Sequence, residues 1–143
     1  MDKVKVETSG KNYTQKVTAR SHRWLADEPE DLGGADKGPN PYEQLLGGLG
    51  SCTVTTVQMY AERKDWPLKK VEAVLEHKKV QAPGEGADDK ISEIKIDLKL
   101  AGDLDDSQRE RLHKIANRCP VKRTLEGEIK IKADRGDAAV DSQ

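Results

Sequence analysis

The sequence predicts a single α+β domain whose elements follow the order βββ-α-ββ-α-β. Apolar and polar residues alternate with a period of two in several segments, as in strands that bury one face. Two other segments combine helix start signals with apolar residues at helical spacing. The 143 residues fit one domain, which we place at residues 1–133, and the polar residues 134–143 are expected to form a disordered tail.

Alternation predicts three strands in the N-terminal part of the chain, at about 2–8, 13–20 and 22–26. A turn signal, Ser9-Gly-Lys-Asn12, separates the first two. The following residues, 27–41, contain three glycines and three prolines and therefore form a loop. Loops of this length are often functional when they are ordered.

A long helix is predicted from Pro41 to about Lys64. Asn40 suits the N-cap, Pro41 the first helical position, and the Glu43 carboxylate the positive end of the helix dipole. The apolar residues occupy more than one face, which is typical of a helix buried centrally or against a partner. Three glycines lie inside it, at positions 47, 48 and 50. Either they allow another helix or a substrate to approach the backbone closely, or the helix is broken at residues 47–50.

Two longer alternating segments, Leu68 to Val80 and Ile91 to Leu100, follow this helix. In each of them the apolar residues share one face of the strand. The residues between them, 82–89, are rich in glycine and acidic side chains and predict a flexible hairpin loop.

A second helix is predicted at about 107–118, after an acidic stretch. Pro120 either ends this helix or begins a short helical turn that runs through Leu125. Ile129 and Ile131 alternate with charged residues and predict a final strand.

The composition limits the classes of partner. Lysine and arginine number 25 against 26 acidic residues, so the net charge of -1 gives no reason to expect a nucleic acid. No segment approaches the ~20 apolar residues of a membrane span, and the charged N-terminus does not resemble a signal peptide. We therefore expect a cytoplasmic protein. Only 34% of the residues are hydrophobic and none is Phe, so some apolar surface is expected to lie between subunits.

Two cysteines carry most of the information about function. Cys52 lies in an apolar helical run and Cys119 lies just past the second predicted helix, 67 positions later. If the fold brings them together they form a redox couple, and otherwise they are two small buried hydrophobic residues. Neither the spacing of the cysteines nor that of the three histidines matches a metal site, so we expect no metal and no cofactor.

A nucleophilic cysteine must be a thiolate at neutral pH. Cys52 lies about three turns into its helix, beyond the reach of the helix dipole, so a basic side chain must activate it. Arg20, Arg23 and Lys16 are the candidates. Glu43 could orient such an arginine through a bidentate ion pair. Cys119 would cap the short helix if Pro120 begins one, which would make Cys119 the more acidic thiol.

The segment Asn40-Pro-Tyr-Glu43-Gln-Leu-Leu-Gly-Gly-Leu-Gly-Ser-Cys52-Thr resembles the first cysteine motif of the OsmC/Ohr superfamily, the osmotically inducible and organic hydroperoxide resistance proteins. Cys119-Pro120-Val121 resembles the second cysteine motif of that family. The resemblance covers roughly residues 2–133. It implies an intertwined homodimer with two central helices, sheets shared between subunits and active sites at the dimer interface.

The resemblance also implies a thiol-dependent peroxidase. Cys52 would become a sulfenic acid on reaction with a hydroperoxide, and Cys119 would resolve it as a disulfide that an external dithiol reduces. Glu43 matches the glutamate that positions the family's arginine. That arginine usually lies on an early strand, where residues 10–16 contain none here, which leaves Arg20 and Arg23 as candidates. The alternatives are a non-catalytic module that binds a small apolar ligand and a structural stress protein.

Overall fold

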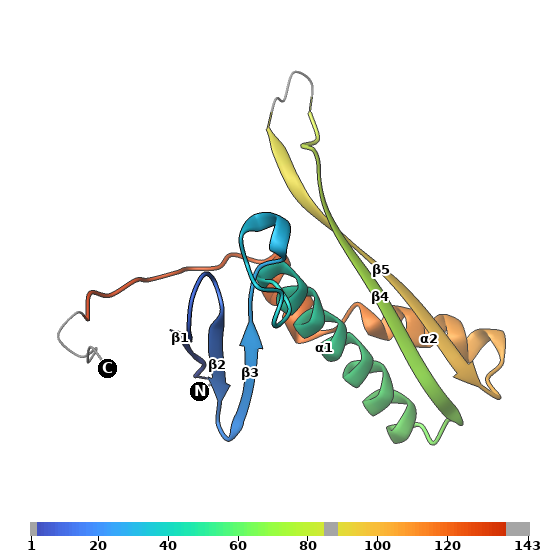
Figure 1. The fold of residues 1–143 in the computed structure, drawn as a ribbon. Helices are drawn as coiled ribbons and strands as arrows, with labels where there is room; N and C mark the ends of the chain where they lie inside the picture. The colour runs from blue at the N-terminus through green and yellow to red at the C-terminus, as the bar shows by residue number, and fades with distance from the viewer. Residues whose placement is uncertain (1–2, 85–88, 137–143) are drawn as a thin grey trace.

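The computed structural model describes residues 3–84 and 89–136. Its elements are β1 (Lys5–Thr8), β2 (Gln15–Ala19), β3 (His22–Ala26), the 3-10 helix η1 (Glu30–Leu32), α1 (Pro41–Arg63), β4 (Leu68–Gln81), β5 (Lys90–Gly102), α2 (Asp106–Ala116) and α3 (Pro120–Glu126). The α+β prediction is confirmed. Figure 1 shows a small three-stranded sheet on one side of α1 and the long β4–β5 hairpin on the other, with α2 beside the hairpin.

The start of helix α1 is specified by local interactions. The Asn40 side chain accepts a hydrogen bond from the Glu43 backbone N–H at 2.8 Å, and Glu43 Oε1 accepts one from the Asn40 N–H at 2.8 Å. This reciprocal capping box fixes the first turn. The helix continues without a break to Arg63, as predicted, so the alternative of a broken helix at the glycines is wrong.

The three glycines of α1 differ in their surroundings. A Cβ atom at Gly50 would lie 2.8 Å from Leu75 Cδ1, so Gly50 lets α1 lie close to strand β4. Gly47 and Gly48 face no atom within 4 Å in the described part of the chain. The neighbour of Gly50 is thus a side chain of strand β4 and not the other helix or the substrate that was predicted, while Gly47 and Gly48 leave an open surface.

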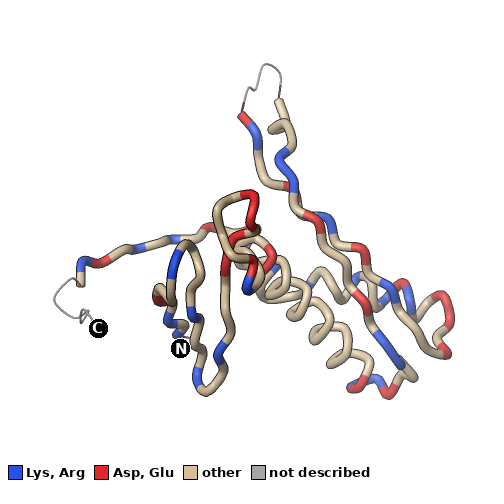
Figure 2. Tube along the Cα trace, viewed as in Figure 1, with Lys and Arg blue, Asp and Glu red and all other residues tan. Residues whose placement is uncertain are grey.

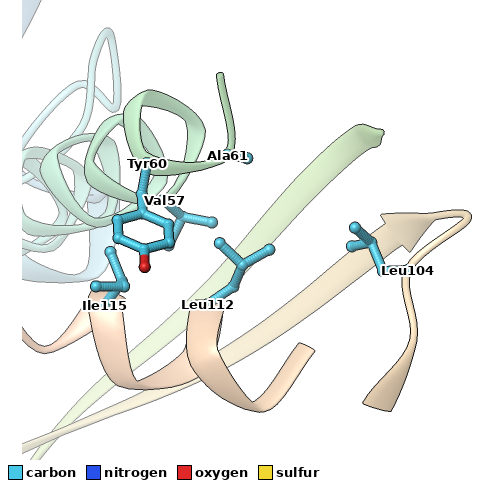
Figure 3. Packing of buried hydrophobic residues seen from close by; sticks show 6 residues of the cluster. All are labelled: Val57, Tyr60, Ala61, Leu104, Leu112 and Ile115. Carbon is cyan, nitrogen blue, oxygen red and sulfur yellow. The ribbon is translucent and has the colours of Figure 1, made fainter. Parts of the chain in front are cut away.

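The hydrophobic core joins α1, α2 and the hairpin. The antiparallel register of β4 and β5 pairs Val71 with Leu100 and Leu75 with Ile96, which places the apolar face predicted from alternation on the helical side. Figure 3 shows the buried cluster, in which α1 packs on α2: Val57, Tyr60, Ala61, Leu104, Leu112 and Ile115. This packing fixes the end of α2, and with it Cys119, relative to the middle of α1.

The C-terminal part differs from the prediction in one respect. Pro120 begins a short helix, α3, in agreement with one of the two alternatives. The strand predicted at Ile129 and Ile131 is not formed, and Figure 1 shows this segment running away from the body of the molecule. Ile131 is 87% exposed, and in the described chain residues 129–131 pair with no strand. Of the predicted tail, residues 137–143 lie outside the described residues, as do 85–88 of the hairpin loop.

The loop that precedes α1 is held by a buried carboxylate. Asp27 is only 1% exposed. Its two oxygens accept hydrogen bonds from the Thr14 hydroxyl at 2.8 Å and from the backbone N–H groups of Glu28, Ala35 and Lys37 at 2.8, 3.4 and 3.2 Å. Burial acts to raise the pKa of this carboxyl, but the hydrogen bonds lower it below its ordinary value. The ionised form of Asp27 therefore organises the long loop.

We expect Asp27→Asn to lower the urea midpoint at pH 7, because an amide cannot accept all of these hydrogen bonds. A carboxyl whose pKa is depressed in the folded state stabilises the protein above its unfolded pKa, near 3.9. This contribution is lost as the pH falls through the lower, folded value. The difference in urea midpoint between wild type and Asp27→Asn should therefore shrink between pH 5 and pH 2. The exposed Asp31→Asn serves as the control, and a constant difference would contradict the assignment.

No helix within residues 3–84 and 89–136 is long and apolar enough to cross a membrane.

Candidate functional site

The fold brings the two cysteines into contact. Cys52 lies on α1, and Cys119 occupies the N-cap position of α3, one residue before Pro120. The two side chains lie near enough to shift each other's pKa, and both are free thiols. Cys119 is fully buried, whereas Cys52 is partly exposed. The sequence left two possibilities, a redox pair or two separate core residues. The structure supports an interacting pair of thiols.

The α2–α3 junction positions Cys119 through its backbone. Its N–H donates to the Ala116 carbonyl at 3.3 Å, and its carbonyl accepts from the Arg123 N–H at 3.1 Å. This bend directs the first N–H groups of α3 toward the sulfur atoms. The Val121 N–H acts to lower the pKa of both cysteines, and the Lys122 N–H acts to lower that of Cys119.

The two thiols have opposite pKa shifts. Burial raises the pKa of Cys52, and its hydrogen bond with Cys119 raises it further. Burial also acts to raise the pKa of Cys119, but the hydrogen bond from Cys52 and the N–H groups of Lys122 and Val121 outweigh it and lower the pKa. The direction agrees with the expectation that Cys119 is the more acidic thiol. Because the two thiols interact, their two ionisation steps belong to the pair rather than to either sulfur alone.

Two threonines next to the pair were not identified from the sequence. The buried Thr53 hydroxyl donates to the Leu49 carbonyl at 2.9 Å and acts on the pKa of Cys119, and the Thr56 hydroxyl donates to the Cys52 carbonyl at 2.8 Å and acts on the pKa of Cys52. Thr56 follows Cys52 by four residues, and side chains at this spacing lie on one helix face. That spacing is the signal that could have indicated Thr56, whereas the contact of Thr53 with Cys119 depends on how α3 packs.

Glu43 lies away from the Cys52 of its own chain. Their separation of nine positions corresponds to about 2.5 helical turns, which places Glu43 about 13–14 Å along the axis and on the opposite side of α1. Its carboxylate holds the capping box and lines a groove of about 560 Å³ between α1 and β4, formed with Gly47, Gly50 and Leu75 among others. Cys52 does not line that groove.

The two candidate arginines lie in and after the β2–β3 turn. Arg20 adopts a positive φ of 55° in this turn, and Arg23 pairs with Thr18 on β2. Both side chains are exposed. The neighbouring Trp24 donates a hydrogen bond from Nε1 to Gln44 on α1 at 3.0 Å. Successive side chains on a strand point to opposite faces, so Arg23 points away from the α1 helix of its own chain.

A second groove lies between α1, the β4–β5 hairpin and α3. It encloses about 430 Å³ and combines an apolar wall with polar groups at the rim; its lining includes Tyr42, Leu45, Leu49, His77, Ile94, Lys122 and Leu125. We call it the α1–α3 groove. Leu49 precedes Cys52 by three residues and Lys122 follows Cys119 by three, so the groove begins about one helical turn from each sulfur.

The rim of the α1–α3 groove is organised by His77 on β4. Its ring stacks on Tyr42 with centroids 4.6 Å apart, and its Nε2 lies 3.0 Å from Ser92 Oγ. Lys79 donates to the same hydroxyl at 3.0 Å. An apolar molecule with a polar end fits this combination of surfaces.

Comparison with known proteins places the chain in a family. The model of the family described as OsmC-like protein matches residues 34–134. An OsmC-like protein from Mycoplasma pneumoniae shares the fold with a TM-score of 0.69 and 19% identity, over 89% of this chain and 88% of that one. A putative osmotic stress induced and detoxification response protein from Psychrobacter arcticus has a TM-score of 0.67 and 25% sequence identity, over 86% of this chain and 87% of that chain.

An organic hydroperoxide resistance protein from Legionella pneumophila shares the fold with a TM-score of 0.65 and 18% identity, over 89% of this chain and 90% of that chain. The comparison with curated protein sequences gave no match.

Proposed function

Because this chain belongs to the family of OsmC-like proteins, we propose that it is a cytoplasmic thiol-dependent peroxidase that reduces organic hydroperoxides. The observation that carries the proposal is the contact between Cys52 and Cys119, two sulfurs that lie 67 positions apart in the sequence. The description of the Legionella pneumophila protein with the same fold as an organic hydroperoxide resistance protein supports it.

The reaction uses the two cysteines in sequence. The Cys52 thiolate attacks the terminal oxygen of the hydroperoxide, so an S–O bond forms, the O–O bond breaks and an alcohol leaves. Cys119 then attacks the Cys52 sulfenic acid and displaces water, which leaves a disulfide. An external dithiol reduces this disulfide and completes the cycle. The partial exposure of Cys52 favours it as the sulfur that meets the peroxide.

The α1–α3 groove is the proposed site for the organic part of the substrate. Its apolar wall begins about one turn from Cys52 and suits a hydrocarbon or aryl group. The experiment that tests the function is the consumption of cumene hydroperoxide with dithiothreitol as the reductant. A protein that binds cumene alcohol in this groove but leaves the peroxide unconsumed would instead be a ligand-binding module.

We propose that the active protein is a homodimer whose two copies are intertwined. Figure 2 shows that α1 carries charged residues only near its ends, and the sequence from Gln44 to Ala61 contains none. Several apolar side chains are exposed in the single chain; they include Val6 at 60%, Met59 at 65% and Ile131 at 87%. A helix without charges and with an open glycine surface suits a central position between subunits.

In a dimer, the second copy would supply the carboxylate and the arginine that the cysteine pair lacks within one chain. Glu43, Arg20 and Arg23 do not reach the Cys52 of their own chain, as described above. We therefore propose that they act on the cysteine pair of the other copy, where Glu43 holds one of the arginines beside the sulfur. If the two copies exchanged the segment around Ile129 and Ile131, this segment would pair with the edge strand of a sheet in the other copy.

We expect Gly48→Ala to weaken the dimer, because its methyl group would separate the α1 helices. In a monomer the same change should stabilise the exposed helix by about 1 kcal/mol, since alanine is the better helix former. Sedimentation equilibrium gives the dissociation constant, and urea unfolding at dissociating concentrations gives the stability of the monomer. An unchanged dissociation constant would show that Gly48 does not lie in the interface.

A further inference from the structure

Tyr60 places a polar group at the edge of the core. Its side chain is 8% exposed and packs against α2, with the hydroxyl oxygen pointing toward that helix (Figure 3). The oxygen accepts a hydrogen bond from Arg111 Nε on α2 at 3.0 Å. In the part of the chain that the structure describes, the hydroxyl donates no hydrogen bond in return. The Tyr60 O–H can therefore donate to a group that is not part of this chain.

Three cations surround the Tyr60 ring. The guanidinium carbons of Arg63 and Arg111 lie 5.3 and 5.5 Å from the ring centroid, and Lys64 Nζ lies 5.7 Å from it. At these distances a cation is attracted to an aromatic ring. The hydrogen bond from Arg111 lowers the pKa of Tyr60 against the effect of burial, and nearby positive charges lower it further. Positive charge is thus concentrated around one hydroxyl group.

We call Arg63, Lys64 and Arg111 the Tyr60 cation cluster. Within residues 3–84 and 89–136, no carboxylate oxygen lies within 4.0 Å of any of the three, although six lysine–glutamate pairs elsewhere meet that limit. Glu62 and Asp65 adjoin the cluster in sequence but form no ion pair with it. The end of α1 favours a cation at Arg63 and Lys64. Arg111 lies in the middle of α2, where the helix dipole gives no such reason.

Arg111 differs from Arg109, which precedes it by two residues on α2. Arg109 donates from Nε, Nη1 and Nη2 to three backbone carbonyls within residues 100–104, so all of its guanidinium nitrogens are used. Arg111 makes one hydrogen bond in the described chain, from Nε to Tyr60. Its two terminal nitrogens are therefore available to the oxygen atoms of a ligand, in the planar arrangement that suits a phosphate.

We propose that the Tyr60 cation cluster binds a phosphate group, either as free phosphate or as part of a phosphorylated small molecule. This site goes beyond the proposed peroxidase function and involves no redox step. The terminal nitrogens of Arg111 and the Tyr60 O–H donate to the phosphate oxygens, and the two cations at the end of α1 neutralise its charge. Three positive charges match the double negative charge of a phosphate better than the single charge of a carboxylate.

The first test is isothermal titration calorimetry of the full chain with inorganic phosphate, at pH 7 and constant ionic strength. We expect saturable binding. Tyr60→Phe keeps the ring and removes the O–H, and it should weaken binding by about tenfold, because a hydrogen bond to a charged group is lost. Arg111→Gln should weaken it by about tenfold or more for the same reason. Circular dichroism checks that both variants are folded.

The control is Lys95→Gln, which removes an exposed positive charge from β5 and should leave the dissociation constant unchanged. The proposal is overturned if millimolar phosphate shows no saturable binding. It is also overturned if the wild type, Tyr60→Phe and Arg111→Gln bind phosphate equally well, since the binding would then lie elsewhere on the protein.

A second measurement follows the ionisation of Tyr60 through the ultraviolet absorbance of tyrosinate. The chain has three tyrosines, and the difference between wild type and Tyr60→Phe isolates the contribution of Tyr60. Without phosphate, its midpoint should lie below the ordinary value near 10. Bound phosphate should move the midpoint to higher pH, because the anion offsets the cations and accepts the hydroxyl proton. An unshifted midpoint at saturating phosphate would overturn the proposal.

Two further experiments identify what occupies the cluster. Tighter binding of glycerol 3-phosphate than of inorganic phosphate would point to a phosphorylated small molecule, and equal or weaker binding to free phosphate. If phosphate does not bind and Arg63→Gln weakens the dimer, the cluster belongs to the subunit interface and the proposal fails. None of these measurements contains a peroxide, so a failed peroxidase assay leaves their outcome unaffected.

Discussion

Cys52→Ser is expected to reduce the rate of hydroperoxide consumption by at least about 100-fold, because a serine hydroxyl stays protonated where a thiol ionises. The substitution is nearly isosteric, so the contact with Cys119 and the packing of α3 should remain. The measurement is the initial rate with cumene hydroperoxide and excess dithiothreitol. Since Cys52 is the partly exposed member of the pair, Cys119 alone should not sustain turnover.

Two controls make this result specific. Ser51→Ala changes the exposed neighbour of Cys52 on α1 and should retain most of the activity. In Cys119→Ser the oxidised enzyme should accumulate as a Cys52 sulfenic acid, which dimedone traps, because the disulfide cannot form. Peroxide consumption by Cys52→Ser at the wild-type rate would contradict the assignment of the nucleophile.

Leu112→Ala is expected to have the largest effect on stability, with a loss of about 3–4 kcal/mol in the free energy of unfolding. Leu112 is 0% exposed at the centre of the cluster between α1 and α2, and its truncation leaves a cavity that rigid neighbours cannot close (Figure 3). Urea unfolding measures the loss. The protein concentration must be fixed, since association contributes to the stability of a dimer.

The matched control is Leu32→Ala in the loop before α1. Leu32 is 62% exposed, so the same truncation should change the free energy of unfolding by less than about 0.5 kcal/mol. A loss below about 1 kcal/mol in Leu112→Ala would mean that the packing of α2 on α1 contributes little. Because this packing also positions Cys119, we expect Leu112→Ala to slow disulfide formation as well.

The sequence by itself determined the local elements. Asn40, Pro41 and Glu43 specify the start of α1 because their interactions reach only three residues along the chain. The alternation that predicted β4 and β5 is likewise a local pattern, imposed by one buried face. The Cys-Pro dipeptide left two outcomes open, and the N-cap position of Cys119 follows from the one in which Pro120 begins a helix.

Only the tertiary structure decided the relations between distant residues. The packing of Leu112 and Ile115 on α1 places Cys119 against Cys52, and no local pattern contains that contact. The strand expected near Ile131 did not form in the described chain, because alternation gives a segment its preferred conformation but does not place it against the edge of a sheet. The acidity of the two thiols depends on which sulfur the fold buries and which N–H groups it directs there. These are properties of the folded arrangement, since burial and hydrogen bonding of a group are set by residues far from it in the sequence.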